Sequence, residues 1–201
     1  EIEAGTDFKA YNILQLRLHP ALIKLKQEID ASPDDKKYEL DLTYITSRGK
    51  WYFISWKGDE SKSGGIATNI GIHFFDMLIW IFGKVQTNIV HMFEPDKSAG
   101  YLELERARVR WFLSVDEKTL PQEVAASGQR TYRSITLGGR EIEFSAGFTD
   151  LHNLSYQKIL QGKGFGLDKA RPSIETVYTI RHSKPDLSKG EQHPFCYNLV
   201  K

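Results

Sequence analysis

Three polar side chains stand at helical spacing within the otherwise apolar stretch SGGIATNIGIHFFDMLIWIFG, residues 63–83. Asn69, His73 and Asp76 are four and three residues apart, so a helix over this stretch places them along one face. Imidazole has the unperturbed pKa nearest neutrality, so His73 could take or give a proton in catalysis. The amide of Asn69 could orient the ring or a substrate hydroxyl, but it carries no charge.

The same polar face has a second explanation. A helix that is apolar almost all round is normally buried, and buried polar groups need partners. The three side chains could therefore be hydrogen-bonded inside a core instead of lining a cleft. A metal site is disfavoured, because no second His or Cys lies at ligand spacing. Gly64 and Gly65 allow close backbone approach at the start of the helix, where anions are favoured.

The segment before this helix, residues 47–65, is expected to be a long loop that combines basic and aromatic side chains. These are Arg48, Lys50, Lys57, Lys62, Trp51, Tyr52 and Trp56. Loops of this length in compact domains are usually functional or disordered. One explanation is a solvated loop with half-buried aromatic rings. The other is a wall for an anionic, ring-bearing ligand, since Arg and Lys bind phosphates and carboxylates and aromatic rings cover sugar or base faces.

Two further features are interpreted more simply. The glycines of GKGFG, residues 162–166, follow a predicted helix, whereas a dinucleotide-binding loop opens a helix directly after a strand. They therefore predict a tight connection. The other histidines are assigned structural or surface roles, and His152, on the helix that follows a hairpin, is the one placed best to reach a cleft.

Composition limits the classes of protein to consider. The chain has 201 residues, 40% of them hydrophobic, which suits one globular domain with a sizeable core. The net charge of +1 provides no large field for nucleic acid or a membrane surface. We find no signal peptide and no apolar run near the length of a membrane span. Cys196 is the only cysteine, which excludes an internal disulfide and fits a reducing cytoplasm. The polar start without Met suggests a piece of a longer protein.

Hydrophobic periodicity predicts the elements that position these residues. Strands are expected over residues 9–18, 38–46, 85–93, 100–105 and 107–115, with a hairpin over 133–145 that turns at Gly138 and Gly139. Helices are expected over residues 21–30, around residues 65–82, over 149–162 with caps at Thr149 and Gly162, and from Pro172 onward. The tail after Pro185 is expected to be loose. This order predicts an α+β two-layer sandwich, a largely antiparallel open sheet with helices on one face. The other face would be exposed or paired with a second subunit.

The motif Asn69-x-Gly71-x-His73-x-x-Asp76, after a glycine pair, resembles the Asp-x-Gly-x-His-x-x-Asp motif of the Gfo/Idh/MocA oxidoreductases. The segments LQLRLHP, WYFISWKGDESKSGG and GFTDLHNLSYQKILQGKGFGLDKARPSIE are most similar to one branch, the bacterial UDP-N-acetyl-2-amino-2-deoxyglucuronate dehydrogenases. These enzymes oxidise C3 of UDP-N-acetylglucosaminuronic acid with NAD in lipopolysaccharide and O-antigen sugar biosynthesis. The resemblance covers nearly the whole chain.

The resemblance implies a domain organisation. Residues 20–201 would be the substrate-binding and oligomerisation domain, of the dihydrodipicolinate-reductase-like type. Residues 1–19 would be a strand leading in from an N-terminal Rossmann domain, which binds NAD and is absent from this chain. The chain alone is therefore expected to be inactive and to bind no cofactor itself. A cytoplasmic homo-oligomer formed through the open sheet face is expected, with no nucleic-acid or membrane partner.

The resemblance also implies roles for individual residues. His73 would be the base that removes the C3 hydroxyl proton, and Asn69, in place of the usual aspartate, would orient His73 or the substrate. Six further residues are candidates for binding the uronate and diphosphate groups: Gln15, Arg17, Tyr52, Lys57, Lys62 and Ser63. Two alternatives stay open, namely a family member acting on a free sugar or a cyclitol, and a non-catalytic oligomerisation module.

Overall fold

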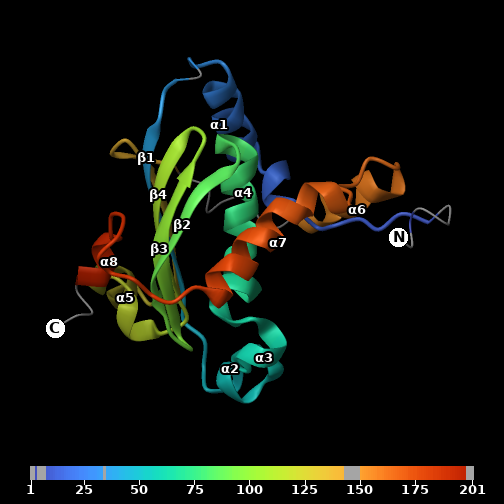
Figure 1. The fold of residues 1–201 in the computed structure, drawn as a ribbon. Helices are drawn as coiled ribbons and strands as arrows, with labels where there is room; N and C mark the ends of the chain where they lie inside the picture. The colour runs from blue at the N-terminus through green and yellow to red at the C-terminus, as the bar shows by residue number, and fades with distance from the viewer. Residues whose placement is uncertain (1–2, 4–7, 34, 143–149, 198–201) are drawn as a thin grey trace.

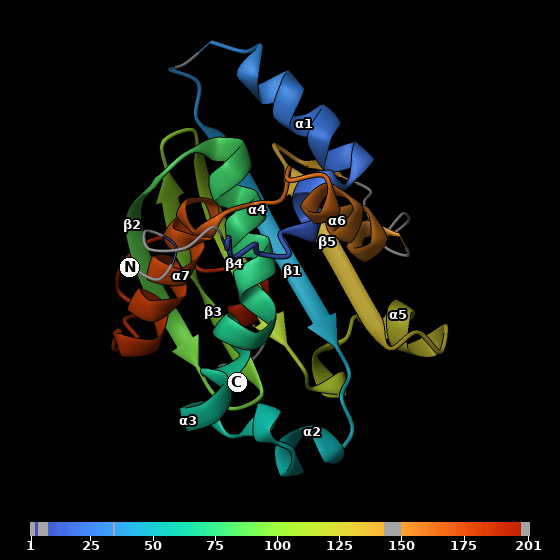
Figure 2. The same cartoon turned by 90° about the vertical axis from the view of Figure 1, so that its right-hand side faces the viewer.

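The computed structural model describes residue 3 and residues 8–33, 35–142 and 150–197, which form a mixed sheet with helices (Figures 1 and 2). The described strands are β1 (Tyr38–Thr46), β2 (Val85–Phe93), β3 (Lys97–Leu104), β4 (Ala107–Ser114), β5 (Thr131–Leu137) and β6 (Arg140–Glu141). Their order in the sheet is β2-β3-β4-β1-β5-β6. Neighbours run antiparallel except β1 and β4, which are parallel. The predicted fold class, a largely antiparallel α+β sandwich, is confirmed.

The long helices α1 (Pro20–Asp30), α4 (Ile72–Phe82) and α7 (Leu167–His182) lie together on one face of the sheet (Figure 1). The shorter α6 (Leu151–Leu160) projects away from the sheet beside the N-terminal segment. Helices α2 (Trp51–Ile54) and α3 (Glu60–Ser63) lie beyond the start of α4 (Figure 2). The start of α4 therefore lies between these short helices and the junction of α6 with α7.

The main core lies between α4 and the sheet. The inward-facing residues of β4, including Val109, Trp111 and Leu113, are fully buried, which confirms the alternation predicted for this strand. Phe75 of α4 meets Trp111 edge to face, with ring centroids 5.2 Å apart. A Cβ added to Gly71 would lie 2.7 Å from Leu113 Cδ1, so a glycine is required where the helix approaches the strand most closely.

Residues Glu60–Phe82 are long and apolar enough, by length and composition alone, to span a membrane. This corrects the expectation that the chain has no such run. Its side chains explain the composition differently, because Phe75, Leu78 and Phe82 are fully buried against the protein's own core. The stretch is a core helix, as the two polar positions His73 and Asp76 within it predict.

The second face of the sheet carries the C-terminal segment, which corrects the prediction that the tail after Pro185 is loose. Cys196 of α8 (Pro194–Tyr197) packs with Ile45, Ala99 and Phe112 on this face. Thr43 Oγ1 lies 3.1 Å from His193 Nε2, and the His193 ring stacks on Phe112. The short helix α5 (Gln122–Ala126) lies on the same side of the sheet (Figure 1). The part of this face near Phe112 is therefore covered.

This face also carries a cluster of ion pairs on β1 and β4. Arg110 makes a bidentate ion pair with Asp41 at 2.6 and 2.8 Å and also reaches Glu191 at 3.2 Å. Arg108 pairs with Glu39 at 3.0 Å. Ion pairs therefore form part of the surface that these strands present on the second face.

Several predicted boundaries need correction. Residues 9–18 are not one strand, because Gln15–Leu18 forms the 3-10 helix η2 and Asn12 makes an isolated bridge with Phe165. Residues 47–65 are not an irregular loop, since they contain α2, α3 and the 3-10 helix η3 (Trp56–Gly58). Helix α7 begins at Leu167, five residues before Pro172, which lies inside it.

The predicted hairpin turn is confirmed, with positive φ at both central glycines, 55° at Gly138 and 82° at Gly139. Residues 143–149, which include the predicted N-cap Thr149, lie outside the described residues. At the other end of α6, Gly162 adopts φ 71° two residues beyond Leu160 and so ends the helical path.

Candidate active site

The candidate catalytic histidine lies where a helix changes its geometry. Residues Ala67–Gly71 form a π-helical segment, η4, that runs directly into α4, and His73 is the second residue of α4. Single π-turns within helices are rare and are often found at functional sites. His73 is exposed, whereas its neighbours Phe74 and Phe75 are buried. The polar face formed by Asn69, His73 and Asp76 is therefore open to solvent at His73.

At its other end, the polar face is buried at Asp76. Asp76 and Arg17 form a bidentate ion pair with distances of 2.9 Å from Nε to Oδ2 and 2.7 Å from Nη2 to Oδ1. Their side chains are only 3% and 9% exposed. Arg17 Nη2 also donates to the carbonyl of Lys169 at 3.0 Å, and the guanidinium lies 5.5 Å from the Phe165 ring centroid. Both explanations of the polar face therefore apply to part of it: Asp76 is paired inside the core, whereas His73 lies at the open surface.

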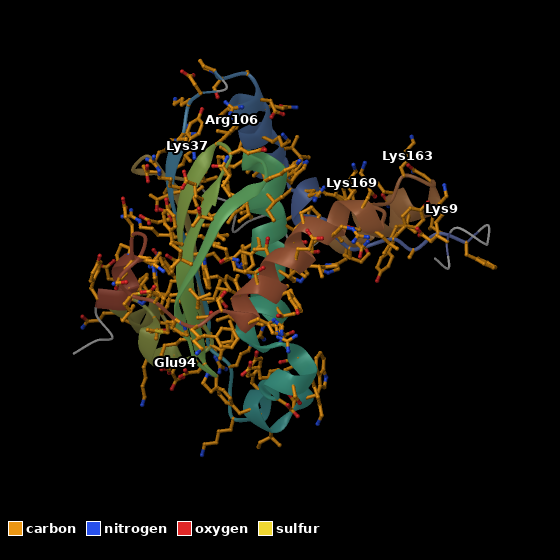
Figure 3. All side chains as sticks on the ribbon, viewed as in Figure 1. Lys9, Lys37, Glu94, Arg106, Lys163 and Lys169 are labelled. Atoms are coloured by element: carbon orange, nitrogen blue, oxygen red, sulfur yellow. The ribbon has the colours of Figure 1, made fainter. Side chains whose placement is uncertain are left out.

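This ion pair joins three distant parts of the chain. Arg17 comes from η2, Asp76 from α4 and Lys169 from the first turn of α7. Figure 3 places Lys169 near the junction of α7 with α6 and the N-terminal segment. Because Gln15 and Arg17 lie on the same short 3-10 turn, the pair also fixes the position of Gln15 relative to His73.

Gln15 reaches the ring of His73, with 3.5 Å between Gln15 Nε2 and His73 Nδ1. Although the residue keeps an exposed surface, the protein packed around the ring lowers the pKa of His73, chiefly through desolvation. The carboxylate of Asp76 opposes this lowering and the nearby His152 adds to it. His73 is therefore neutral at neutral pH, the form in which an imidazole can accept a proton.

Among the described residues, no hydrogen bond joins Asn69 to His73. Its Nδ2 donates to the hydroxyl of Tyr52 at 3.3 Å. Tyr52 is 2% exposed and anchors α2 against the π-helical segment. The contact ties the aromatic segment before the helix to the residue one turn away from His73.

The remaining predicted binding residues are held within their own segment. Lys57 lies 5.9 Å from the ring centroids of Trp51 and of Trp56, and Lys62 pairs with Asp59 at 3.0 Å. Ser63 is buried, and its hydroxyl accepts from the backbone N–H of Gly65 at 3.1 Å. The structure therefore brings Gln15, Arg17, Asn69 and Tyr52 together around the start of α4, whereas the contacts of both lysines stay within the segment from α2 to α3.

Sequence reasoning missed Phe165 and Lys169, which complete the surroundings of Arg17. The signal was present in the glycines of residues 162–166. A Cβ on Gly164 would lie 2.5 Å from Tyr11 Cδ1, so only glycine lets this connection pass the N-terminal segment. The backbone N–H of Asn12 then donates to the Phe165 carbonyl at 2.7 Å. The predicted tight connection is confirmed, and it serves to place Phe165 over Arg17.

A cavity of about 370 Å³ lies elsewhere, between β2 and α7, where Val85, Asn88 and Thr176 are among its lining residues. None of the predicted site residues lines it.

In the part of the chain that the structure describes, no group of three or more His, Cys, Asp or Glu side chains could hold a metal ion. The chemistry at His73 is thus that of an open imidazole beside amides and a sealed ion pair.

Comparison with known proteins identifies the family of this fold. Residues 36–120 match the model described as "Oxidoreductase family, C-terminal alpha/beta domain", GFO_IDH_MocA_C. The structure of the WlbA (WbpB) dehydrogenase from Thermus thermophilus in complex with NAD and alpha-ketoglutarate is 51% identical, with a TM-score of 0.89. The same enzyme in complex with NAD and UDP-GlcNAcA matches with 50% identity and a TM-score of 0.88. Both matches cover 96% of this chain and 62% of the other.

A third structure, the WlbA dehydrogenase from Bordetella pertussis in complex with NADH and UDP-GlcNAcA, shares the fold at 19% identity. Its TM-score is 0.66, and the match covers 90% of this chain and 63% of the other. The chain thus spans less than two thirds of the length of these dehydrogenases. The chain carries the C-terminal alpha/beta domain of the Gfo/Idh/MocA oxidoreductase family.

Proposed function

We propose that this chain is the substrate-binding part of an NAD-dependent dehydrogenase that oxidises C3 of UDP-N-acetylglucosaminuronic acid. The observation that carries the proposal is the exposed position of His73 at the start of α4, in a chain 50% identical to a dehydrogenase crystallised with NAD and UDP-GlcNAcA. A role in making the sugars of lipopolysaccharide and O-antigen follows from that substrate.

His73 acts as the base in this proposal. Oxidation of a secondary alcohol to a ketone removes one proton from the hydroxyl and one hydride from the carbon. An unprotonated imidazole suits the first task at neutral pH, and the lowered pKa of His73 favours that form. Asp76 is committed to Arg17, so it supports the site by position and is not itself the base.

NAD, when bound, supplies the acceptor for the hydride. The glycine-rich connection of residues 162–166 does not fit a dinucleotide-binding loop, because it follows helix α6 and Gly164 packs against Tyr11. We therefore assign the cofactor to a separate Rossmann domain and infer that the chain alone does not turn over. What this chain contributes is the substrate surface and the proton acceptor.

The substrate-binding assignments are proposals of different strength. Asn69 lies one turn from His73, and Lys57 and Lys62 supply positive charge on the adjoining segment. Tyr52 is 2% exposed, so its hydrogen bond with Asn69 favours support of Asn69 over direct contact with the substrate. Arg17 is buried and held by Asp76, which favours an anchoring role over direct contact with the uronate. Ser63 is buried too, so its backbone contact with Gly65 favours shaping of the loop.

Assembly and location are part of the same proposal. A homo-oligomer would form on the second face of the sheet, where the ion pairs of Arg108 and Arg110 present charge and the C-terminal segment covers Phe112. Sedimentation at low and high salt tests this, because a charged interface weakens as ions screen it. Cys196, the single and buried cysteine, supports a place in the reducing cytoplasm.

The experiment that tests the function is calorimetric titration of the chain with UDP-N-acetylglucosaminuronic acid, UDP and a free cyclitol. The proposal expects the sugar nucleotide to bind and UDP alone to bind more weakly, with no binding of the cyclitol. Binding of the cyclitol without UDP-dependent binding would instead favour the family members that act on free polyols. No binding of any of the three, in a chain that is folded, would favour a non-catalytic oligomerisation module.

A further inference from the structure

The polar end of Gln15 is turned toward a single group. Its Nε2 lies 3.5 Å from His73 Nδ1, at the outer limit of a hydrogen bond. Its Oε1 is buried and has no hydrogen-bond partner among the described residues. An atom closed off from solvent cannot meet a substrate unless the side chain moves. The position of this oxygen therefore points to a role inside the protein.

The chemistry of the two groups makes their orientations interdependent. A neutral imidazole carries a proton on one nitrogen and a lone pair on the other. If the amide nitrogen of Gln15 faces Nδ1, the ring proton must be on Nε2. If the amide oxygen faces Nδ1, the proton is on Nδ1 and the lone pair is on Nε2. Both ends of an amide have the same shape, so a half turn of the amide exchanges these states. It brings the oxygen to the ring, where Nδ1–H can donate to it, and moves the NH2 group into the buried position.

Other groups that could fix the ring are already committed. Asn69, one turn earlier on the same helix, donates to Tyr52. The carboxylate of Asp76 is held by Arg17. Gln15 is thus the polar side chain that the described contacts place against Nδ1.

We propose that Gln15 is a positioning residue for His73. Its carbonyl oxygen accepts the Nδ1–H of the ring, which keeps the lone pair on Nε2, the nitrogen left available to take a proton from a substrate hydroxyl. The purpose of this arrangement depends on the proposed function, but the position of the ring proton does not. Orienting hydrogen bonds of this kind decide which nitrogen of a catalytic histidine is the base.

Charged neighbours also affect the ring, so the test must separate them from Gln15. Asp76 lies on the same helix, His152 lies on α6, and Arg17 lies on η2. From α7, the side chain of Lys169 is directed to Asp168, at 3.3 Å. Asp76 and His152 act on the pKa of His73 through charge, and all four groups stay in place when Gln15 is changed.

The experiment is nitrogen NMR of the His73 ring in the 201-residue chain, at a pH above the pKa of the ring. The result expected is a protonated Nδ1 and an unprotonated Nε2. A resting ring with its proton on Nε2 overturns the proposal with no variant needed. Because the measurement does not involve turnover, its failure is distinguishable from failure of the proposed function, which binding of the sugar nucleotide tests separately.

Two variants and one control sharpen the result. Gln15→Met removes the acceptor and should shift the ring toward the Nε2–H form that a free histidine side chain favours. Gln15→Glu places a carboxylate against Nδ1 and should raise the pKa of His73 by about one pH unit or more. Gln122→Glu makes the same change on the exposed surface of α5, beyond the sheet, and should leave the ring unchanged. If folded Gln15 variants keep the wild-type ring proton and pKa, Gln15 does not position His73.

Discussion

The buried ion pair between Arg17 and Asp76 is the contact on which the geometry of the site depends most. The substitution Asp76→Asn keeps the size of the side chain and removes its charge. The amide oxygen can still accept one hydrogen bond from Arg17, but the guanidinium stays buried without an opposite charge, beside the carbonyl of Lys169 and the ring of Phe165. Breaking a buried pair by removing one partner costs about 3–5 kcal/mol, because the other charge stays desolvated and unpaired.

Urea unfolding of the chain at neutral pH measures this loss directly as a change in the free energy of unfolding. The matched control is Asp30→Asn, which removes an acceptor from the pair between Lys26 and Asp30, at 2.7 Å but with a carboxylate that is 55% exposed. An exposed pair at this helical spacing contributes about 0.3–0.5 kcal/mol. The same substitution should therefore be several times more destabilising at position 76 than at position 30.

The double variant Arg17→Met with Asp76→Leu tests the reason for the loss. If the cost of Asp76→Asn comes from an unpaired buried charge, replacing both partners with apolar side chains should recover most of the stability. Equal losses for Asp76→Asn and Asp30→Asn would refute the reasoning. So would a double variant less stable than Asp76→Asn alone.

Three further predictions concern other parts of the fold. Burial lowers the pKa of His193 to about 4; since the unfolded ring titrates near 6.5, the stability due to its neutral form is complete above that pH and is lost as pH falls toward 4. The contribution of His193 to the free energy of unfolding, measured with urea, should be about 2 kcal/mol smaller at pH 5 than at pH 7. The His193→Gln variant should lose correspondingly less free energy of unfolding between these pH values, and identical pH dependence in both proteins would contradict this. Burial raises the pKa of the Cys196 thiol to about 11, so iodoacetamide at pH 8 should label it only after urea is added, and rapid labelling of the folded chain would argue against a covered sheet face. Gly71→Ala should destabilise the chain by about 1–3 kcal/mol because the new methyl group meets Leu113 and Phe75; unchanged urea unfolding would show that the helix can move away from β4.

The strands were predictable because their periodicity has one cause. One face of β4 is buried against α4, so alternation at Val109, Trp111 and Leu113 reports that face directly. The hairpin at Gly138 and Gly139 was predictable for a similarly local reason, since two residues with positive φ favour glycine.

The N-terminal segment and the long segment before α4 were not predictable in the same way. Residues 9–18 have the composition of a strand, yet Gln15–Leu18 turns into a 3-10 helix, where Arg17 pairs with Asp76. That partner lies 59 positions away in the chain, so no local pattern reveals it. The start of α7 was placed too late because Pro172 resembles a first helical residue, whereas tertiary packing carries the helix through it.

The candidate site was predictable in its residues more than in their roles. The spacing of Asn69, His73 and Asp76 correctly predicted a shared helix, but spacing alone does not distinguish an open imidazole from a sealed carboxylate. That distinction depends on Arg17 and Phe165, which other segments supply. The resemblance to the oxidoreductase family singled out His73, and the structure places it as an exposed residue, on which its proposed role depends.

The most direct test of the central claim is turnover by the His73→Asn variant in a protein that joins this chain to an NAD-binding domain, such as that of the Thermus thermophilus relative. The unsubstituted protein should form NADH with UDP-N-acetylglucosaminuronic acid. The variant should bind NAD and the sugar nucleotide as before and lose about 10²–10⁴-fold in kcat, the range that a general base contributes. Undiminished kcat in the variant would remove His73 from the chemistry and contradict the account.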